Sequence, residues 1–74
     1  MEAEESSVQI KGAEYRFGDV IAVTLDGGRT FVGALIGFDP ADESPSGRDE
    51  VEIAEELFIR ALQVDEISSI EKVA

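Results

Sequence analysis

Carboxylates are the only abundant side chains in this sequence that could do chemistry. The chain of 74 residues has 17 Asp and Glu residues and no histidine or cysteine. Catalysis needs a poised acid, base, nucleophile or metal, and at this density adjacent acids such as Glu55-Glu56 and Asp65-Glu66 arise by chance. The other candidates are two lysines, Tyr15 and scattered hydroxyl groups. We therefore predict that the protein is not an enzyme and has no catalytic residue.

A dense group of acids lies in a segment with the composition of a loop. Residues 39–49 contain both prolines, two serines and a glycine, which favour turns and loops. The oxygens of Asp39, Asp42 and Glu43 lack the alternating ligand spacing of a calcium loop. We predict no metal site and no cofactor, and we treat these three residues as a candidate acidic contact. A loop of like charges that do not pack is also expected to be mobile.

Net charge is the strongest compositional feature of the chain. The formal charge is −11, and the six Lys and Arg residues are scattered along the sequence. Binding to nucleic acid normally needs clustered basic residues that displace counterions, so we do not expect nucleic acid as a partner. Two interpretations of the acidity remain open. It either serves solubility or forms an acidic face that meets a basic protein.

The elements that must position these residues are predicted to be strands. Ile21, Val23 and Leu25 recur at period two, the spacing of a half-buried strand. Asp26-Gly27-Gly28 suits a tight turn, and residues 30–38 follow as a second strand rich in β-branched and aromatic side chains. Ahead of this unit, residues 8–11 alternate, with turn candidates near residues 12 and 18. Residues 1–7 are expected to be a disordered acidic leader, and residues 8–74 a single domain.

Residues 50–64 are ambiguous between a helix and strands. Ala54, Leu57, Phe58, Ala61 and Leu62 fit helical spacing in a Glu-rich context. The alternation of residues 51 and 53 and the bulky run at residues 57–59 favour strands instead. We predict two strands with a break near residues 55–56. A single helical turn at residues 65–67 and a short closing strand at residues 68–73 would follow.

The strand expected at residues 30–38 is apolar on both faces. Phe31, Gly33, Leu35 and Gly37 would share one face, and Val32, Ala34, Ile36 and Phe38 the other. A strand with one wet face normally alternates between apolar and polar residues. Val32, Ala34 and Ile36 are therefore a candidate protein-interaction site. Either Tyr15 or Phe17 covers them within the chain, or they meet another subunit.

Residues 23–39 resemble the first signature of Sm-like proteins. They comprise a strand, the turn Asp26-Gly27-Gly28-Arg29, and a second strand with a central glycine that ends in Phe38-Asp39. In that family this unit forms the sharply bent half of a small barrel, and Gly33 suits such a bend because it has no Cβ. The resemblance implies a small barrel of the SH3/Sm-like type. Sm-like proteins also assemble by pairing exposed strand edges, so it implies a homo-oligomer as one possible state.

The residues that bind uridine-rich RNA in Sm-like proteins are not matched. An asparagine that follows the Phe-Asp pair is replaced by Glu43, and the Arg-Gly pair of the second motif is absent because Arg60 precedes Ala61. A carboxylate in place of an amide repels phosphate. The resemblance therefore implies the fold rather than the RNA chemistry of the family.

Together these patterns predict an all-β protein, a small, strongly bent barrel of five to six strands with one short helical turn. Its predicted function is that of a non-catalytic Sm-like interaction module that binds protein, either itself or a basic partner. The alternative is a nucleic-acid-binding regulator of the Sm-like type. No apolar run approaches the ~18–20 residues of a membrane helix, and the N-terminus lacks the features of a secretory signal. We therefore expect a cytoplasmic protein with no membrane partner.

Overall fold

The computed structural model describes residues 7–73, so the leader expected at residues 1–7 lies outside the described residues except for Ser7. The described chain is all-β with two short 3-10 turns, and it contains no helix long and apolar enough to cross a membrane. The strands are β1 (Ser7–Ile10), β2 (Ala13–Arg16), β3 (Val20–Leu25), β4 (Thr30–Asp39), β5 (Glu50–Ala54), β6 (Ile59–Gln63) and β7 (Ile67–Lys72). Ser7, which was expected to belong to the leader, is the first residue of β1.

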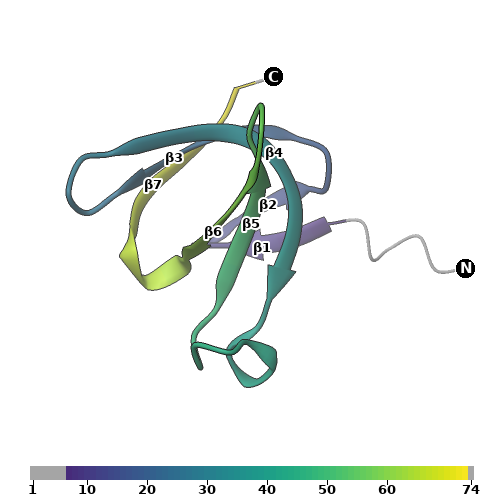
Figure 1. Ribbon diagram of the computed structural model, residues 1–74, viewed down its shortest axis with the longest axis vertical. Helices are drawn as coiled ribbons and strands as arrows, with labels where there is room; N and C mark the ends of the chain where they lie inside the picture. The colour runs from purple at the N-terminus through teal and green to yellow at the C-terminus, as the bar shows by residue number, and fades with distance from the viewer. Residues whose placement is uncertain (1–6, 74) are drawn as a thin grey trace, which may run out of the picture.

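The strands form two antiparallel sheets. One is the hairpin β1-β2, and the other has five strands in the order β6-β5-β4-β3-β7 (Figure 1). The edge strands β6 and β7 are not paired with each other, so the five-stranded sheet is not closed. The described chain has seven strands and two 3-10 turns, Ala41–Glu43 and Val64–Glu66, where five to six strands and one turn were predicted. The predicted number of strands was too low because the sequence analysis recognised only one strand before β3.

The hairpin of β3 and β4 confirms the clearest sequence prediction. Its strands pair from Val20 opposite Ala34 to Thr24 opposite Thr30. The turn between them is closed by the Leu25 N–H, which donates to the Arg29 carbonyl at 2.8 Å. Gly28 has a φ of 94°, a conformation that costs glycine little and other residues more. The Asp-Gly-Gly sequence therefore fixes the position of the turn.

At Gly33 the backbones of β4 and β5 approach too closely for a side chain. A Cβ at this position would lie 2.6 Å from the carbonyl oxygen of Ala54. Strand β4 continues through this point as one long, strongly curved ribbon that contributes to both halves of the sheet (Figure 1). The absence of a side chain therefore permits the bend, as the mid-strand glycine predicted.

A β-bulge at Ile36 changes the face of every residue that follows in β4. Leu35 lies opposite Ile53 and Phe38 opposite Val51, with a register shift between residues 35 and 37. Since a bulge adds one residue to one strand, Phe38 returns to the inner face, where it packs against the core. The prediction that Phe38 shares a face with Val32, Ala34 and Ile36 was therefore wrong.

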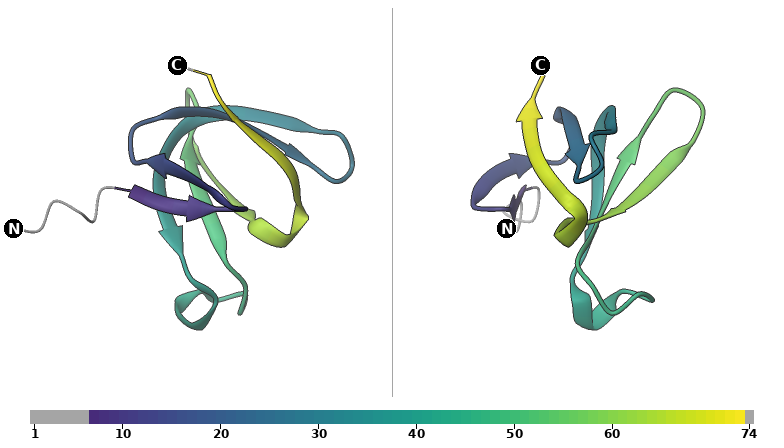
Figure 2. Two further views of the ribbon diagram at one scale, coloured as in Figure 1. Left: turned by 180° about the vertical axis from the view of Figure 1, so that it is seen from behind. Right: turned by 90° about the vertical axis from the view of Figure 1, so that its left-hand side faces the viewer.

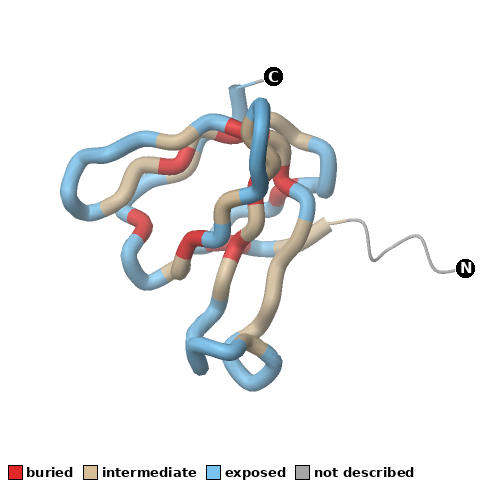
Figure 3. Tube along the Cα trace, in the orientation of Figure 1, coloured by how far each residue is buried: buried red, intermediate tan, exposed pale blue. Residues whose placement is uncertain are grey.

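The core is aliphatic and lies between the five-stranded sheet and the N-terminal hairpin. We call the face of the sheet that packs on this core the inner face. Figure 3 shows the buried positions along the strands, while the turns and loops are exposed. The buried residues are Ile10, Tyr15, Ile21, Val23, Leu35, Val51, Ile53, Leu62 and Ile67.

The hairpin β1-β2 covers the inner face. Ile10 and Tyr15 are buried among the sheet residues, and the Tyr15 hydroxyl donates to the carbonyl of Ile70 at 3.4 Å. A domain of this length has a core worth only ~3–5 kcal/mol. The hairpin supplies Ile10 and Tyr15, two of the nine buried core residues in the described chain.

The ambiguous region after the acidic loop consists of two strands, as predicted. β5 and β6 pair antiparallel from Glu50 opposite Gln63 to Ala54 opposite Ile59, and the break lies at residues 55–58. The 3-10 turn at Val64–Glu66 and the closing strand β7 lie within a residue of their predicted positions. Ile70 packs against the core from β7, as expected.

We predict that Gly33→Ala lowers the free energy of unfolding by about 1–3 kcal/mol, because the new methyl group overlaps the Ala54 carbonyl. Gly27→Ala is the matched control, since a Cβ there meets nothing within 4 Å. It should leave stability unchanged or raise it by up to ~1 kcal/mol. Urea unfolding of both variants measures the difference. Equal stability of the two variants would show that the approach at Gly33 does not constrain the fold.

Candidate functional site

The predicted interaction residues Val32, Ala34 and Ile36 lie on the outer face of the sheet, opposite the core. Val32 is 52% exposed and Ile36 43% exposed, while Ala34 is half-buried. Tyr15 does not cover them, because it is buried in the core on the inner face. Phe17 is itself 37% exposed. Of the two alternatives for this face, cover by Tyr15 does not occur, and Phe17 leaves Val32 and Ile36 exposed among the described residues. Contact with another subunit stays a prediction.

Strand pairing extends this open face into one apolar row. Val20 lies opposite Ala34, Ala34 opposite Ala54, and Ala54 opposite Ile59. Directly opposed residues in antiparallel strands point to the same side of the sheet, so four apolar side chains cross four strands in register. We define the outer apolar face by these four residues together with Val32 and Ile36.

The outer apolar face ends at an exposed hairpin tip. Leu57 is 89% exposed, Phe58 54% and Ile59 63%. In Figure 2 (right) the β5-β6 hairpin projects away from β7 and from the N-terminal hairpin. The bulky run at residues 57–59 was visible in the sequence, but the place of Ile59 opposite Ala54, at the end of the apolar row, depends on strand register, so the sequence prediction missed it.

Arg60 holds the base of this tip from the inner side. Its guanidinium lies 4.1 Å from the ring centre of Phe31 and 5.1 Å from that of Phe58. Its Nε donates to Glu55 Oε2 at 2.5 Å, and the side chains of both partners are less than one-third exposed. Charge-assisted hydrogen bonds and cation–π contacts are both stronger when partly desolvated. Arg60 therefore fixes the hairpin tip in place.

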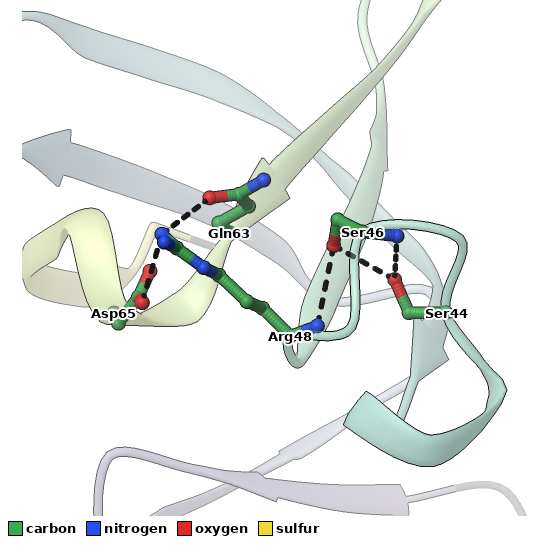
Figure 4. A network of polar contacts seen from close by, with 5 residues as sticks. All are labelled: Ser44, Ser46, Arg48, Gln63 and Asp65. Carbon is green, nitrogen blue, oxygen red and sulfur yellow. Dashed lines mark hydrogen bonds and ion pairs between the residues drawn. The ribbon is translucent and has the colours of Figure 1, made fainter.

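The acidic loop is held by polar contacts rather than by packing. Arg48 Nη1 lies 3.2 Å from Asp65 Oδ2 and donates to Gln63 Oε1 at 3.1 Å, and its backbone N–H reaches Ser46 Oγ (Figure 4). Ala41 N–H also donates to Asp49 Oδ1 at 2.7 Å. These contacts lie at the surface beside a shallow hollow of about 270 Å³. They tie the loop to the end of β6, and its predicted mobility stays a prediction.

The predicted acidic residues do not converge on one point. Asp42 and Glu43 are exposed in the 3-10 turn Ala41–Glu43, whereas Asp39 ends β4 opposite Glu50. Within residues 7–73 no group of three or more acidic side chains is placed to hold a metal ion. The arrangement offers separate carboxylates for contact with cations on another molecule, not a coordination shell.

Two acidic side chains flank the apolar row on the outer face. Glu52 lies opposite Gly37 and Ala61, and Glu50 lies opposite Asp39 and Gln63. Like charges directly opposite each other, as at Asp39 and Glu50, destabilise a sheet slightly. In the part of the chain that the structure describes, neither Glu50 nor Glu52 forms an ion pair. The outer face therefore combines an apolar row with two acids that form no ion pair within residues 7–73.

Comparison of the chain with protein-family models, with curated proteins and with solved structures gave no match. The resemblance to Sm-like proteins therefore rests on residues 23–39 and stays a prediction.

We predict that the two arginines differ in their effect on stability. Arg48→Ala should change the free energy of unfolding by less than ~0.5 kcal/mol, because Arg48 and Asp65 are both more than half exposed. Arg60→Ala, the same substitution at the partly buried pair, should cost about 1–2 kcal/mol. Thermal and urea unfolding give both values. An effect at Arg48 as large as at Arg60 would contradict the surface character of the loop contacts.

Proposed function

We propose that this chain is a non-catalytic protein-interaction module of the Sm-like small-barrel type that binds protein through its outer apolar face. The observation that carries the proposal is the open apolar row of Val20, Ala34, Ala54 and Ile59, with Val32 and Ile36 beside it. Monomeric proteins rarely leave large contiguous apolar patches exposed, and such patches are often interaction sites.

The small-barrel part of the proposal is supported by three local features. The bend at Gly33 brings β4 against Ala54, the turn after Leu25 contains Asp-Gly-Gly-Arg, and the bulge at Ile36 returns Phe38 to the core. Each belongs to the segment that resembles the Sm-like signature. In this proposal the five-stranded sheet is an open form of that barrel, with the N-terminal hairpin covering its inner face.

The alternative function, a nucleic-acid-binding regulator, has weaker support. The arginine nearest to exposed aromatic rings, Arg60, is neutralised by Glu55. The outer face carries Glu50 and Glu52 beside its apolar row. Such a surface repels the phosphate backbone whose neutralisation dominates affinity for nucleic acid.

We predict that the interaction fails in the variant Ile36→Lys although the chain still folds. Ile36 lies in the bulge and is 43% exposed in the single chain, so a lysine there stays solvated and far-UV circular dichroism should be unchanged. At an interface the same ammonium group would be buried without a partner, which costs several kcal/mol. Lys11→Met, a change at an exposed turn of the hairpin β1-β2, is a control away from the site.

The measurement combines light scattering of the purified protein with capture of partners on the immobilised chain. Wild type and Lys11→Met should show the same associations, and Ile36→Lys should lose them. If every association survives in Ile36→Lys and also in Val32→Lys, the outer apolar face is not the interaction site and the proposal fails.

A separate prediction tests the alternative function. The chain should show no submicromolar binding to uridine-rich RNA at ~150 mM salt, because its charge opposes phosphate contacts and salt screens the weak ones that remain. Fluorescence anisotropy with a labelled oligouridine measures this directly. Submicromolar affinity would favour the regulator over the protein-interaction module.

A further inference from the structure

We infer that the free edge of β6 accepts an extended, basic segment of a partner protein as an added antiparallel strand. This inference rests on the proposed function and names the partner's chemistry. In the described chain β6 pairs only with β5, and the opposite side of β6 is the edge of the five-stranded sheet. An unpaired edge is a template for another strand.

The hydrogen-bond pattern of the hairpin identifies the free backbone groups. Glu55 N–H donates to the Phe58 carbonyl, and Val64 N–H donates to the Asp49 carbonyl. Hydrogen-bonded and non-bonded pairs alternate in antiparallel strands, so Arg60 and Leu62 direct their backbone groups to β5. Ile59, Ala61 and Gln63 direct theirs away from it. The edge therefore offers three N–H groups and three carbonyls at alternate residues.

The other edge of the sheet is protected in ways that β6 is not. On β7 the carbonyl of Ile70 accepts the Tyr15 hydroxyl, and Glu71 and Lys72 place charges along the strand. Charged side chains and covering groups are how proteins blunt exposed edges. The residues of β6 with free backbone groups are uncharged, and Ile59 among them is 63% exposed. This difference between the two edges of the sheet assigns strand addition to β6.

The neighbouring side chains define the sequence that the edge would prefer. An added residue opposite Ile59 extends the row of Ala54 and Ile59, which favours an apolar side chain. An added residue opposite Ala61 lies on the same face as Glu52, with only the methyl group of Ala61 between them. A long basic side chain there can therefore reach the Glu52 carboxylate. The position opposite Gln63 is different, because Arg48 already binds the Gln63 amide and supplies a positive charge. A small polar residue fits there.

Charge also decides between a basic partner and a second copy of this chain. Each copy has a formal charge of −11, so two copies repel each other at low salt. Pairing with β7 of a second copy would compete with the Tyr15 contact to Ile70 and bring Glu71 toward Glu50 or Glu52. A basic segment meets none of these obstacles and neutralises carboxylates that form no ion pair among residues 7–73.

The probe is a fluorescent peptide with the central sequence Thr-Val-Lys-Val-Ile, flanked by serines and blocked at both ends. Antiparallel addition would place its threonine, lysine and isoleucine opposite Gln63, Ala61 and Ile59. We expect binding that weakens as salt increases, and about tenfold weaker binding when the peptide lysine is replaced by glutamate. Equal binding of the lysine and glutamate peptides would overturn the assignment of a basic partner.

Protein variants locate the binding site. Glu52→Lys should weaken binding about tenfold, whereas Glu71→Lys, the same charge change on β7, should weaken it no more than twofold. Ala61→Pro removes an edge N–H that does not bond to β5, so it should abolish binding, and Ala61→Ser should retain it. If Glu52→Lys and Glu71→Lys weaken peptide binding equally, binding depends on net charge alone, and the inference is overturned.

Amide hydrogen exchange of the wild-type protein gives a readout that does not depend on whether a variant folds. Added peptide should protect the amides of Ile59, Ala61 and Gln63, while Arg60 and Leu62 change little because they already bond to β5. Protection at β7 would overturn the inference, and so would a dimer in light scattering whose formation protects the amides of Ile59, Ala61 and Gln63 without peptide. If these tests fail while capture of partners remains sensitive to Ile36→Lys, the proposed function stands and only the strand-addition site is wrong.

Discussion

The close approach of β4 to β5 at Gly33 is the constraint on which the rest of this structure depends. Because no Cβ separates Gly33 from the Ala54 carbonyl, one ten-residue strand can pair with β3 through its first half and with β5 through its second. A side chain at this point would force the two backbones apart. The bend brings the apolar residues of all five strands around one small core, which a flat sheet of this size would leave half exposed.

The same bend makes the two faces of the sheet different, because it curves the inner face around the core and leaves the outer face convex. The inner face is concave and small enough for a four-residue-strand hairpin to cover it with Ile10 and Tyr15. No second element of the described chain covers the outer face, where Val32, Ile36 and Ile59 remain exposed. Within residues 7–73 the N-terminal hairpin packs on the inner face, which leaves the side chains of Val32, Ile36 and Ile59 accessible on the outer face.

Local patterns in the sequence predicted most of the strands but not how side chains combine across them. Alternation at Ile21 and Val23 and the Asp-Gly-Gly turn predicted the central hairpin, since both signals lie within a few residues. The face of Phe38 was predicted wrongly, because the bulge at Ile36 arises from pairing with β5 and leaves no mark in the alternation itself. The outer row could not be predicted for the same reason. Val20, Ala34, Ala54 and Ile59 become neighbours only when three registers are set together.

The proposed selectivity of the outer face rests on the distribution of charge. Glu50 and Glu52 flank the apolar row, while the residues at the β6 edge with free backbone groups are uncharged. Repulsion between acidic surfaces disfavours the association of two copies of this chain. The unpaired backbone groups of β6 can form hydrogen bonds with any extended chain that approaches closely. A basic extended segment satisfies both conditions, because its charge lowers the barrier to approach and its backbone completes the sheet. In the proposed strand addition, acidity and an open edge would together favour a basic extended segment over a second copy of this chain.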